Sequence, residues 1–521
     1  MMGDERVAAI HQDWVEKAQN LTPQLLETRV YPRELIEVYS DETAFQGWEK
    51  KTLDSYERVV NQSFDKGESF ILDFGDHQVG YVTLKIKATG SPQDAPLRLK
   101  LIFGEMPCEV AENFDDYNGW ISRSWLQDEI INIDVLPCEL KLPRRYAFRY
   151  LKVMVQATSQ KYKAAFEEIY CTSVSSADPK SVSPLPENLP ADLIAMDRIG
   201  IRTLQNCMQT VFEDGPKRDR RLWIGDLRLQ ALANYESFHN YELVKRCLYL
   251  FAGMTLEKGE VGACLFESPE PHVDDTLLFD YSLFFVATLH DYYLASGDKD
   301  LLHELWPVAV KQLDLAWKKV GEDSLVVDDP SWWCFVDWHP DLNKQASAQA
   351  IFIYCLKRAL VLAEELDSKD DADLVTARIK QLSDAALAKL FDQDEGFFIS
   401  GKDRQISWAS QIWMVLAEVL TPRDSLALMN RLFEQSPVIA PNTPYMYHHL
   451  IEALLTAGDK DRALEQMRSY WGEMVKDGAD TFWEIYNPNE KRLSPYGSNL
   501  INSYCHAWSC TPTYLIRKYF V

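Results

Sequence analysis

The sequence predicts a protein of α and β domains, in which an N-terminal antiparallel β-sandwich is followed by an array of helical hairpins. Hydrophobic and polar residues alternate between about residues 69 and 157, which is the period of half-buried strands. Beyond a Pro- and Ser-rich passage at 173–190, apolar residues recur at the spacing of amphipathic helices. A length of 521 residues also favours two or three domains over a single core.

The first third of the chain carries the strand pattern. Its first 56 residues combine a short helical start with a strand-like run and indicate little about function. Five alternating runs follow: F-I-L-D-F, Y-V-T-L-K-I-K-A, L-R-L-K-L-I-F-G-E, E-I-I-N-I-D-V and R-Y-L-K-V-M-V-Q-A. Strands with one polar face pack as antiparallel sandwiches, because two apolar faces then cover each other. We assign residues 1–175 to an N-terminal region and β-sandwich domain, with its core in 57–175, and residues 176–190 to a linker.

Residues 191–521 contain about twelve periodic apolar segments, which we expect to be helices. The segments lie near 191–211, 226–238, 240–255, 277–296, 299–319, 345–366, 369–391, 405–420, 422–435, 445–457, 459–475 and 498–519. At two joints Gly297 and Gly458 each precede an Asp suited to an N-cap, and at a third Thr421 precedes Pro422. Twelve such helices suggest an (α/α)6 toroid, six inner and six outer, although periodicity is equally compatible with an open α-solenoid.

Composition excludes several functions. With 79 acidic and 54 basic residues the net charge is −25, which speaks against nucleic acid or an anionic membrane as a partner. The N-terminus does not resemble a signal peptide, and no stretch approaches the roughly 20 apolar residues of a membrane span. Ten cysteines without a C-x-x-C pair indicate reduced thiols in a cytoplasmic protein. The sequence contains no H-E-x-x-H metalloprotease motif, no P-loop, no G-x-S-x-G motif and no Rossmann glycine motif. No metal or cofactor is therefore implied.

One stretch, residues 213–226, is unusually dense in charge: it reads E-D-G-P-K-R-D-R-R-L-W-I-G-D. Its Gly-Pro pair interrupts any helix, so the stretch is a loop between two helical segments. One interpretation is a solvated loop whose charges neutralise one another. The other is the floor of a sugar pocket, with carboxylates as acceptors, an arginine as a forked donor and an indole as a flat apolar face. The residues concerned are Asp214, Arg218, Asp219, Trp223 and Asp226.

Four further loops carry aromatic and acidic residues where connectors are usually bland. They are E-S-P-E-P-H-V-D-D (267–275), which runs on to Tyr281; D-D-P-S-W-W-C-F-V-D-W-H (328–339); G-A-D-T-F-W-E-I-Y (478–486); and S-Y-C-H-A-W-S (503–509). Any single tryptophan here fits a core anchor. Together the loops favour a sugar site, because the C–H faces of a sugar ring pack on indoles. The adjacent His448 and His449 lie in an apolar helix start and fit a core role.

The spacing D-x-x-x-R-[acid]-x-x-x-W-x-x-D resembles the signature of the α-L-rhamnosidases of glycoside hydrolase family 78. Further matches at 70–80, 103–105 and 148–150 are similar to the sandwich that precedes the barrel in that family, so the resemblance covers most of the chain. It implies a closed (α/α)6 barrel and an inverting hydrolysis that releases terminal α-L-rhamnose. It also leaves a homodimer open, although no interface is evident in the sequence.

The resemblance also implies roles for individual residues. Asp219 matches the general acid, and Glu484, in T-F-W-E, matches the general base. The residues implied to bind sugar are Asp214, Arg218, Trp223, Asp226, Trp338 and His506, with Tyr281 as a weaker transfer. Most of the family has Glu at the acid position. The shorter Asp219 therefore serves as the acid from a closer backbone, or marks a different sugar or leaving group, or marks a loss of catalysis.

The protonation of Asp219 is a further open point. Its neighbours Asp214 and Asp226 would raise its pKa, whereas Arg218 and Arg220 would lower it if they point inward. For substrates we expect small imported rhamnosides, since no signal peptide is evident and the chain ends just after the last barrel helix. Two alternatives stay open: a toroid glycosidase for another deoxy or neutral sugar, and a non-catalytic sugar-binding protein.

Overall fold

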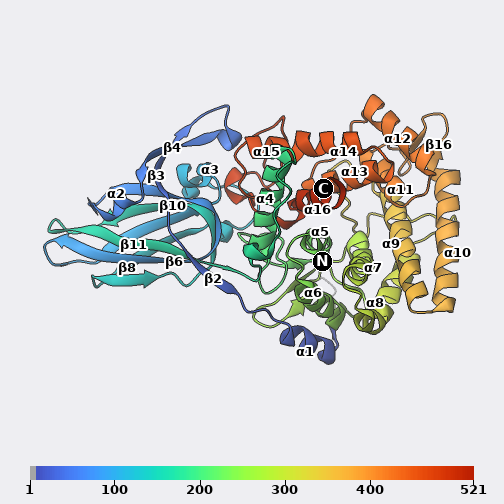
Figure 1. The fold of residues 1–521 in the computed structure, drawn as a ribbon, viewed down its shortest axis with the longest axis horizontal. Helices are drawn as coiled ribbons and strands as arrows, with labels where there is room; N and C mark the ends of the chain where they lie inside the picture. Colours follow the sequence, from blue (N-terminus) through green and yellow to red (C-terminus); the bar gives the residue numbers. More distant parts are fainter. Residues whose placement is uncertain (1–7) are drawn as a thin grey trace.

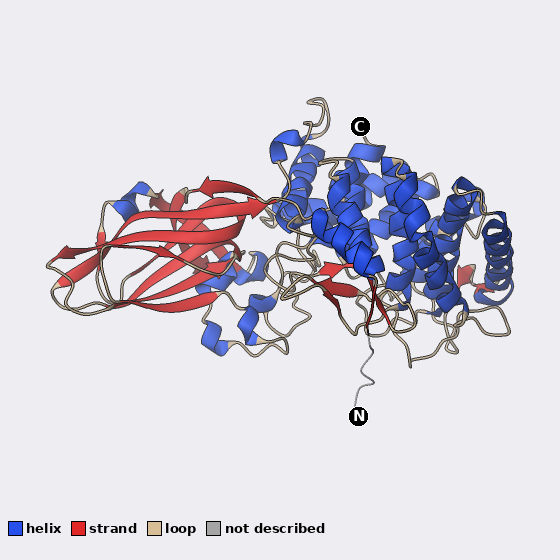
Figure 2. Ribbon diagram, turned by 90° about the horizontal axis from the view of Figure 1, so that it is seen from below, coloured by secondary structure: helices blue, strands red, loops and turns tan. Residues whose placement is uncertain are grey.

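The computed structural model describes residues 8–521 and shows a sheet domain beside a larger helical domain (Figure 1). Strands gather in the first domain and helices in the second (Figure 2). The predicted class, an antiparallel β domain followed by an (α/α)6 barrel, is confirmed. The last long strand ends at Ser175 and the first barrel helix begins at Ala191.

Ten strands form the antiparallel sheet of the first domain. They are β2 (Leu26–Val30), β3 (Glu34–Ser40), β4 (Trp48–Ser55), β5 (Ser63–Phe64), β6 (Ser69–Gly90), β7 (Leu97–Gly104), β8 (Asp128–Ile133), β9 (Cys138–Lys141), β10 (Tyr146–Ala157) and β11 (Tyr162–Ser175). The first half of β6 pairs with β3 and β10, and its second half pairs with β9 and β11. One strand therefore belongs to both halves of the sheet. Buried side chains of β3, β6, β10 and β11 meet in one core, and Cys138 and Leu140 of β9 pack against it.

The pattern suggested two strands where β6 is continuous over 22 residues. The register of β6 against β10 shifts between Phe148 and Tyr150, so the residues around Gly75 form a bulge rather than a turn. Gly75 has φ +85°, and an added Cβ would meet the Arg33 side chain at 2.4 Å. A glycine in mid-run thus marks a bend in one strand, which periodicity alone does not separate from a turn.

Twelve helices of eight or more residues follow the sheet domain in the described chain and build the second domain. They are α4 (Ala191–Cys207), α5 (Ile224–Tyr235), α6 (Tyr241–Gly253), α7 (Phe279–Ser296), α8 (Lys299–Trp317), α9 (Gln345–Glu365), α10 (Lys369–Ala385), α11 (Trp408–Leu416), α12 (Pro422–Gln435), α13 (Pro444–Thr456), α14 (Lys460–Met467) and α16 (Pro512–Tyr519). The predicted joints are present: Gly297 ends α7 with φ 69°, and the side chains of Asp298 and Thr421 cap α8 and α12.

The helices close into a ring. α5, α7, α9, α11 and α13 each pack against the next, and α16 packs against both α5 and α4. This last contact excludes the open solenoid, because the final inner helix returns to the first. α9 is 21 residues long and apolar enough to cross a membrane by length and composition, contrary to our reading of the sequence, but 78 % of its apolar window is buried inside the protein. Its hydrophobicity is that of an inner barrel helix.

Two segments differ from the sequence interpretation. Residues 8–20 were grouped with the sandwich, yet β1 (Ala8–Ile10) pairs with β13 (Met254–Leu256) and α1 (Gln12–Asn20) packs on α6. Long-range contacts hold them there, including a 2.7 Å hydrogen bond from Trp14 Nε1 to Glu304. The last helix was expected from about residue 498 but begins at Pro512. Residues 498–511 instead form a loop with two short 3₁₀ turns.

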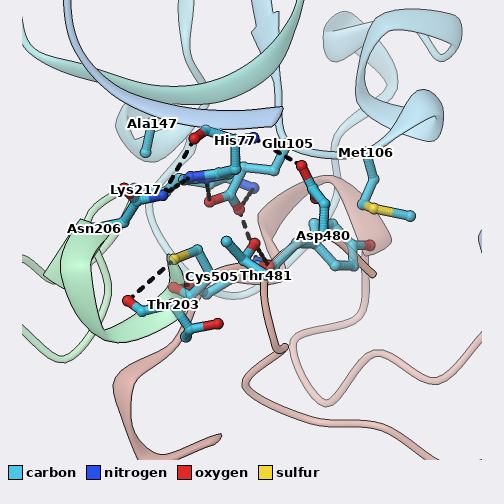
Figure 3. Close-up of polar contacts among 12 residues, drawn as sticks. His77, Glu105, Met106, Ala147, Thr203, Asn206, Lys217, Asp480, Thr481 and Cys505 are labelled. Atoms are coloured by element: carbon cyan, nitrogen blue, oxygen red, sulfur yellow. Dashed lines mark hydrogen bonds and ion pairs between the residues drawn. The ribbon is translucent and has the colours of Figure 1, made fainter. Parts of the chain in front are cut away.

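A buried polar network joins the sheet domain to the loops of the barrel (Figure 3). His77, in the β6 bulge, is 2.8 Å from Glu105 through Nε2 and 2.8 Å from Asn206 of α4 through Nδ1. Lys217, in the charge-dense loop, donates to Glu109 of the sheet domain at 2.6 Å and to the Asn502 carbonyl at 2.7 Å. These groups are buried and paired. The sheet domain therefore holds both the charge-dense loop that contains Lys217 and the loop that contains Asn502.

Candidate active site

The sequence-predicted residues converge at the end of the barrel where the inner helices begin. Asp226 lies in the first turn of α5, and Tyr281 in the first turn of α7. Trp338 lies in the loop before α9, while Glu484 and His506 lie in loops before α16. Loops at one end of a closed ring face one another, so residues distant in sequence meet.

Arg218 is the centre of the site. One terminal nitrogen of its guanidinium donates to Glu484 Oε2, and the other is 3.7 Å from Asp219 Oδ1. Tyr496 donates from its hydroxyl to Glu484 Oε1 at 2.7 Å, so both oxygens of this carboxylate are held. The Asp219 side chain is 24 % exposed, whereas that of Glu484 is 5 % exposed. The two carboxyl groups therefore flank one guanidinium, with Asp219 on the more open side.

His506 lies among three carboxylates. Its Nε2 is 3.7 Å from Glu484 and 4.0 Å from Asp214, and its Nδ1 is 3.7 Å from Asp226. These distances exceed a direct hydrogen bond. Burial, followed by the positive charge of Arg218, lowers the pKa of His506 to about 3, so the imidazole is neutral at physiological pH. Asp226 Oδ1 and His506 Nδ1 are buried without a hydrogen-bond partner in the described chain. Such atoms suit the hydroxyl groups of a bound sugar.

The buried carboxyl groups of the site have perturbed protonation. Burial raises the pKa of Asp214 well above its usual range, and the charges of Asp219 and Asp226 add to the effect. The pKa of Asp226 is raised well above its usual range, first by burial and then by Glu484. The Arg220 side chain donates to the Arg145 carbonyl at 2.9 Å, toward the sheet domain. Of the two arginines considered from sequence, only Arg218 therefore faces Asp219.

Aromatic rings form one wall of the site. Trp338 meets Tyr496 and Trp508 edge-on, with ring centroids 5.6 Å and 5.8 Å apart. Trp223 meets Tyr281 edge-on at 6.3 Å. Tyr281 is only 2 % exposed and lies against Gly225, where an added Cβ would meet its ring at 2.4 Å. Trp338 and Trp223 therefore present partly open rings, and the buried Tyr281 packs against Trp223.

Sequence reasoning missed several residues of the site. Trp508 donates from Nε1 to the Glu484 carbonyl at 2.8 Å, and its place in C-H-A-W was a usable signal. Tyr496 carried none, because S-P-Y-G reads as an ordinary turn. Asp280 accepts hydrogen bonds from the backbone N–H groups of Phe335 and Val336 at 2.9 and 2.8 Å. It thus holds the 328–339 loop that carries Trp338.

Asp337 lies in the loop of Trp338, but its carboxylate has a structural role rather than a role in binding sugar. It accepts from the Thr443 hydroxyl at 2.7 Å and from the Asn442 backbone N–H at 2.8 Å. The Asn442 side chain donates to the Trp338 carbonyl. Burial raises the pKa of Asp337 to about 6 even with these bonds. The loop of Trp338 is therefore tied to the start of α13 by a structural carboxylate.

Asp226→Asn is expected to stabilise the protein, and the gain should grow as pH rises. A raised pKa means that the folded state holds this proton more tightly than the unfolded state, so stability falls as pH rises from about 3.9 through the folded pKa. The Asn side chain cannot ionise, so the variant does not lose this stability as pH rises. We expect an apparent Tm at pH 8 higher by about 2 °C or more, with a smaller gain at pH 5. Thermal unfolding of the wild type and of Asp226→Asn at pH 5 and at pH 8 measures this difference in Tm.

The exposed Asp394→Asn is the matched control, and its Tm should equal that of the wild type at both pH values. A lower Tm for Asp226→Asn at both pH values would show that the ionised carboxylate stabilises the fold, contrary to this account.

Fold and site together define a class. A closed helical toroid whose loops gather paired carboxylates, an arginine, a neutral imidazole and an aromatic wall is suited to bind a sugar and cleave an acetal, as in a glycoside hydrolase. Residues 32–173 match the family model described as the glycosyl hydrolase family 78 alpha-rhamnosidase N-terminal domain, and residues 191–520 match the bacterial alpha-L-rhamnosidase 6 hairpin glycosidase domain. The chain belongs to glycoside hydrolase family 78, the α-rhamnosidases, and is a glycoside hydrolase.

Solved structures agree. A rhamnosidase from Klebsiella oxytoca with rhamnose bound is 48 % identical, with a TM-score of 0.96 over 99 % of this chain and 100 % of that one. A family 78 rhamnosidase of Bacillus sp. GL1 is 22 % identical, with a TM-score of 0.74 over 90 % of this chain and 49 % of that one. An α-L-rhamnosidase from Streptomyces avermitilis, complexed with L-rhamnose, is 16 % identical, with a TM-score of 0.67 over 95 % of this chain and 44 % of that one. The last two show the fold alone. A search of curated proteins gives no match.

Proposed function

We propose that this protein is an inverting α-L-rhamnosidase that releases terminal α-L-rhamnose from small rhamnosides, with Asp219 as general acid and Glu484 as general base. The observation that carries the proposal is the contact of one guanidinium, Arg218, with both carboxyl groups. The contact places both carboxyl groups at one site, as a hydrolysis with an acid and a base on either side of one glycosidic bond requires.

The two carboxyl groups differ in the way that the two roles require. Glu484 is buried and oriented by Arg218 and Tyr496, so it suits a base that holds a water under the anomeric carbon. Asp219 lies on the more exposed side, where a leaving group departs and needs a proton. Asp219 gives its proton to the leaving oxygen as the bond from that oxygen to the anomeric carbon breaks. The oxygen of water bonds to the same carbon from the opposite side, and the proton of this water passes to Glu484.

The shorter side chain at 219 is compatible with this role. The backbone N–H of Arg220 donates to the Gly215 carbonyl at 3.2 Å, and Arg220 has φ 61°, so the loop turns tightly around Asp219. An added Cβ on Gly215 would meet the Arg218 carbonyl at 2.5 Å. These contacts support the interpretation that the backbone, rather than a longer side chain, brings the acid to the bond.

Sugar recognition is assigned to the surrounding groups. Asp214, Asp226 and His506 offer polar atoms for hydroxyl groups, and Trp338 and Trp223 offer apolar faces. These groups lie among buried loops, so the end of a short glycoside enters more easily than the middle of a polymer. The Klebsiella oxytoca rhamnosidase, with rhamnose bound, supports rhamnose as the sugar.

The configuration of the first product tests the mechanism. Proton NMR during hydrolysis of 4-nitrophenyl α-L-rhamnoside should show β-L-rhamnose first, with the α anomer appearing later by mutarotation, because water attacks opposite the leaving group. An initial α anomer would refute inversion. A panel of aryl glycosides of other deoxy and neutral sugars tests the substrate, and binding of rhamnose without turnover would favour a sugar-binding protein instead.

A further inference from the structure

The sheet domain extends an insertion toward the active site between β7 and β8. It contains α3 (Pro107–Ala111) and two 3₁₀ turns, Phe114–Asp116 and Arg123–Trp125. Trp120, between these turns, is 74 % exposed. A large apolar ring that is left uncovered can bind a ligand if its position is fixed and it lies beside the active site.

Trp120 is exposed but held in place. Its indole Nε1 donates to the Pro495 carbonyl at 3.1 Å, and its backbone N–H donates to the Tyr496 carbonyl at 3.2 Å. Gly119 and Gly497 lie against each other, an added Cβ on Gly497 being 3.8 Å from the Gly119 Cα. An aromatic ring that is already ordered loses little rotamer freedom when a ligand stacks on it.

The ring that Trp120 touches belongs to the site. Its centroid is 5.6 Å from that of Tyr496, whose hydroxyl donates to Glu484. The other neighbours of the Tyr496 ring are Trp338 at 5.6 Å and the Arg218 guanidinium at 4.3 Å. Because Tyr496 is only 2 % exposed, Trp120 is the exposed end of an aromatic series that begins at the catalytic carboxylates.

A second residue of the insertion lies near the same centre. Tyr117 donates from its hydroxyl to the Ile121 carbonyl at 2.7 Å, which closes the loop around Trp120. Burial raises the pKa of Tyr117, and the positive charge of Arg218 partly offsets that rise. Arg218 is therefore within electrostatic reach of the insertion, although the two belong to different domains.

We propose that Trp120 is the platform of a leaving-group subsite, on which the flat ring of an aromatic or pyranose leaving group stacks once rhamnose occupies the buried pocket. The proposal rests on the proposed rhamnosidase activity. A terminal sugar fills the space among the buried carboxyl groups, so the rest of the substrate projects outward, where Trp120 offers a rigid apolar face. The sheet domain thereby contributes to substrate choice.

Three substrates test the proposal: 4-nitrophenyl α-L-rhamnoside, a rhamnosyl-glucose disaccharide and methyl α-L-rhamnoside, whose leaving group has no ring. In Trp120→Ala, kcat/KM should fall roughly 3- to 10-fold for a ring-bearing substrate that stacks on Trp120, and less than about 2-fold for the methyl glycoside. Inhibition by free L-rhamnose should be unchanged. Trp120→Phe should restore most of the loss. A loss confined to one ring-bearing substrate would identify the class of leaving group.

Tyr39→Ala is the matched control, because Tyr39 is also an exposed aromatic residue of the sheet domain, at 43 %, but lies on β3. It should leave all three substrates unaffected. Equal losses on methyl and ring-bearing substrates in Trp120→Ala, no loss at all, or a loss in Tyr39→Ala instead would overturn the subsite. So would a change of oligomeric state in Trp120→Ala with unaltered selectivity, which would assign Trp120 to a subunit contact. A wild type inactive on all three would overturn the proposed function as well.

Discussion

Glu484→Gln is expected to lower kcat by about 10²–10⁴-fold on every α-L-rhamnoside, whatever its leaving group. The amide keeps the shape of the side chain and an oxygen that accepts from Tyr496, but it cannot take a proton from water. Because attack by water is common to all substrates, the loss should not depend on the leaving group. Steady-state kinetics on a series of aryl and alkyl rhamnosides measures it.

The same change removes the partner of a buried arginine, so stability must be followed separately. Arg218 retains Asp219 at 3.7 Å but loses its shorter ion pair, and breaking a buried pair costs about 3–5 kcal/mol. Assays should therefore run well below the unfolding temperature of the variant. Glu490→Gln, an exposed glutamate six residues on, is the control and should keep full activity. A Glu484→Gln enzyme with more than a tenth of wild-type kcat would refute the assignment of the base.

Asp219→Asn is expected to produce a loss that depends strongly on the leaving group. Methyl α-L-rhamnoside, whose alkoxide leaves poorly, should lose about 10²–10⁴-fold in kcat/KM, because the bond no longer receives a proton as it breaks. A 2,4-dinitrophenyl rhamnoside, whose phenolate is stable without a proton, should lose far less.

Asp219→Glu separates the chemistry from the local geometry. It keeps a carboxyl group with one more methylene, so the sensitivity to the leaving group should stay close to that of the wild type, even if the absolute rate changes. Equal losses for methyl and dinitrophenyl substrates in Asp219→Asn would show that Asp219 positions the substrate rather than protonating it. Wild-type rates in Asp219→Asn would assign the acid elsewhere.

The limits of sequence reasoning show most clearly at Tyr496 and Asp280. Tyr496 orients Glu484, yet its local sequence is that of a turn, because its role depends on a partner twelve residues away. Asp280 directly precedes Tyr281 in the sequence, but only the fold shows that it holds the loop of Trp338 through two backbone N–H groups. A loop's internal sequence contains little information about which other loop it faces.

The sequence by itself determined most of the helical segments, several of their caps and the runs that form β6, β7, β8 and β10, because periodicity and turn chemistry act between residues a few positions apart. Through its family resemblance it also nominated the residues around Arg218. Only the tertiary structure decided the closure of the ring by α16 on α5, the return of residues 8–20 to the helical domain and the continuity of β6. Those features depend on surfaces that come into contact only when distant segments are folded, and no local pattern records their partners.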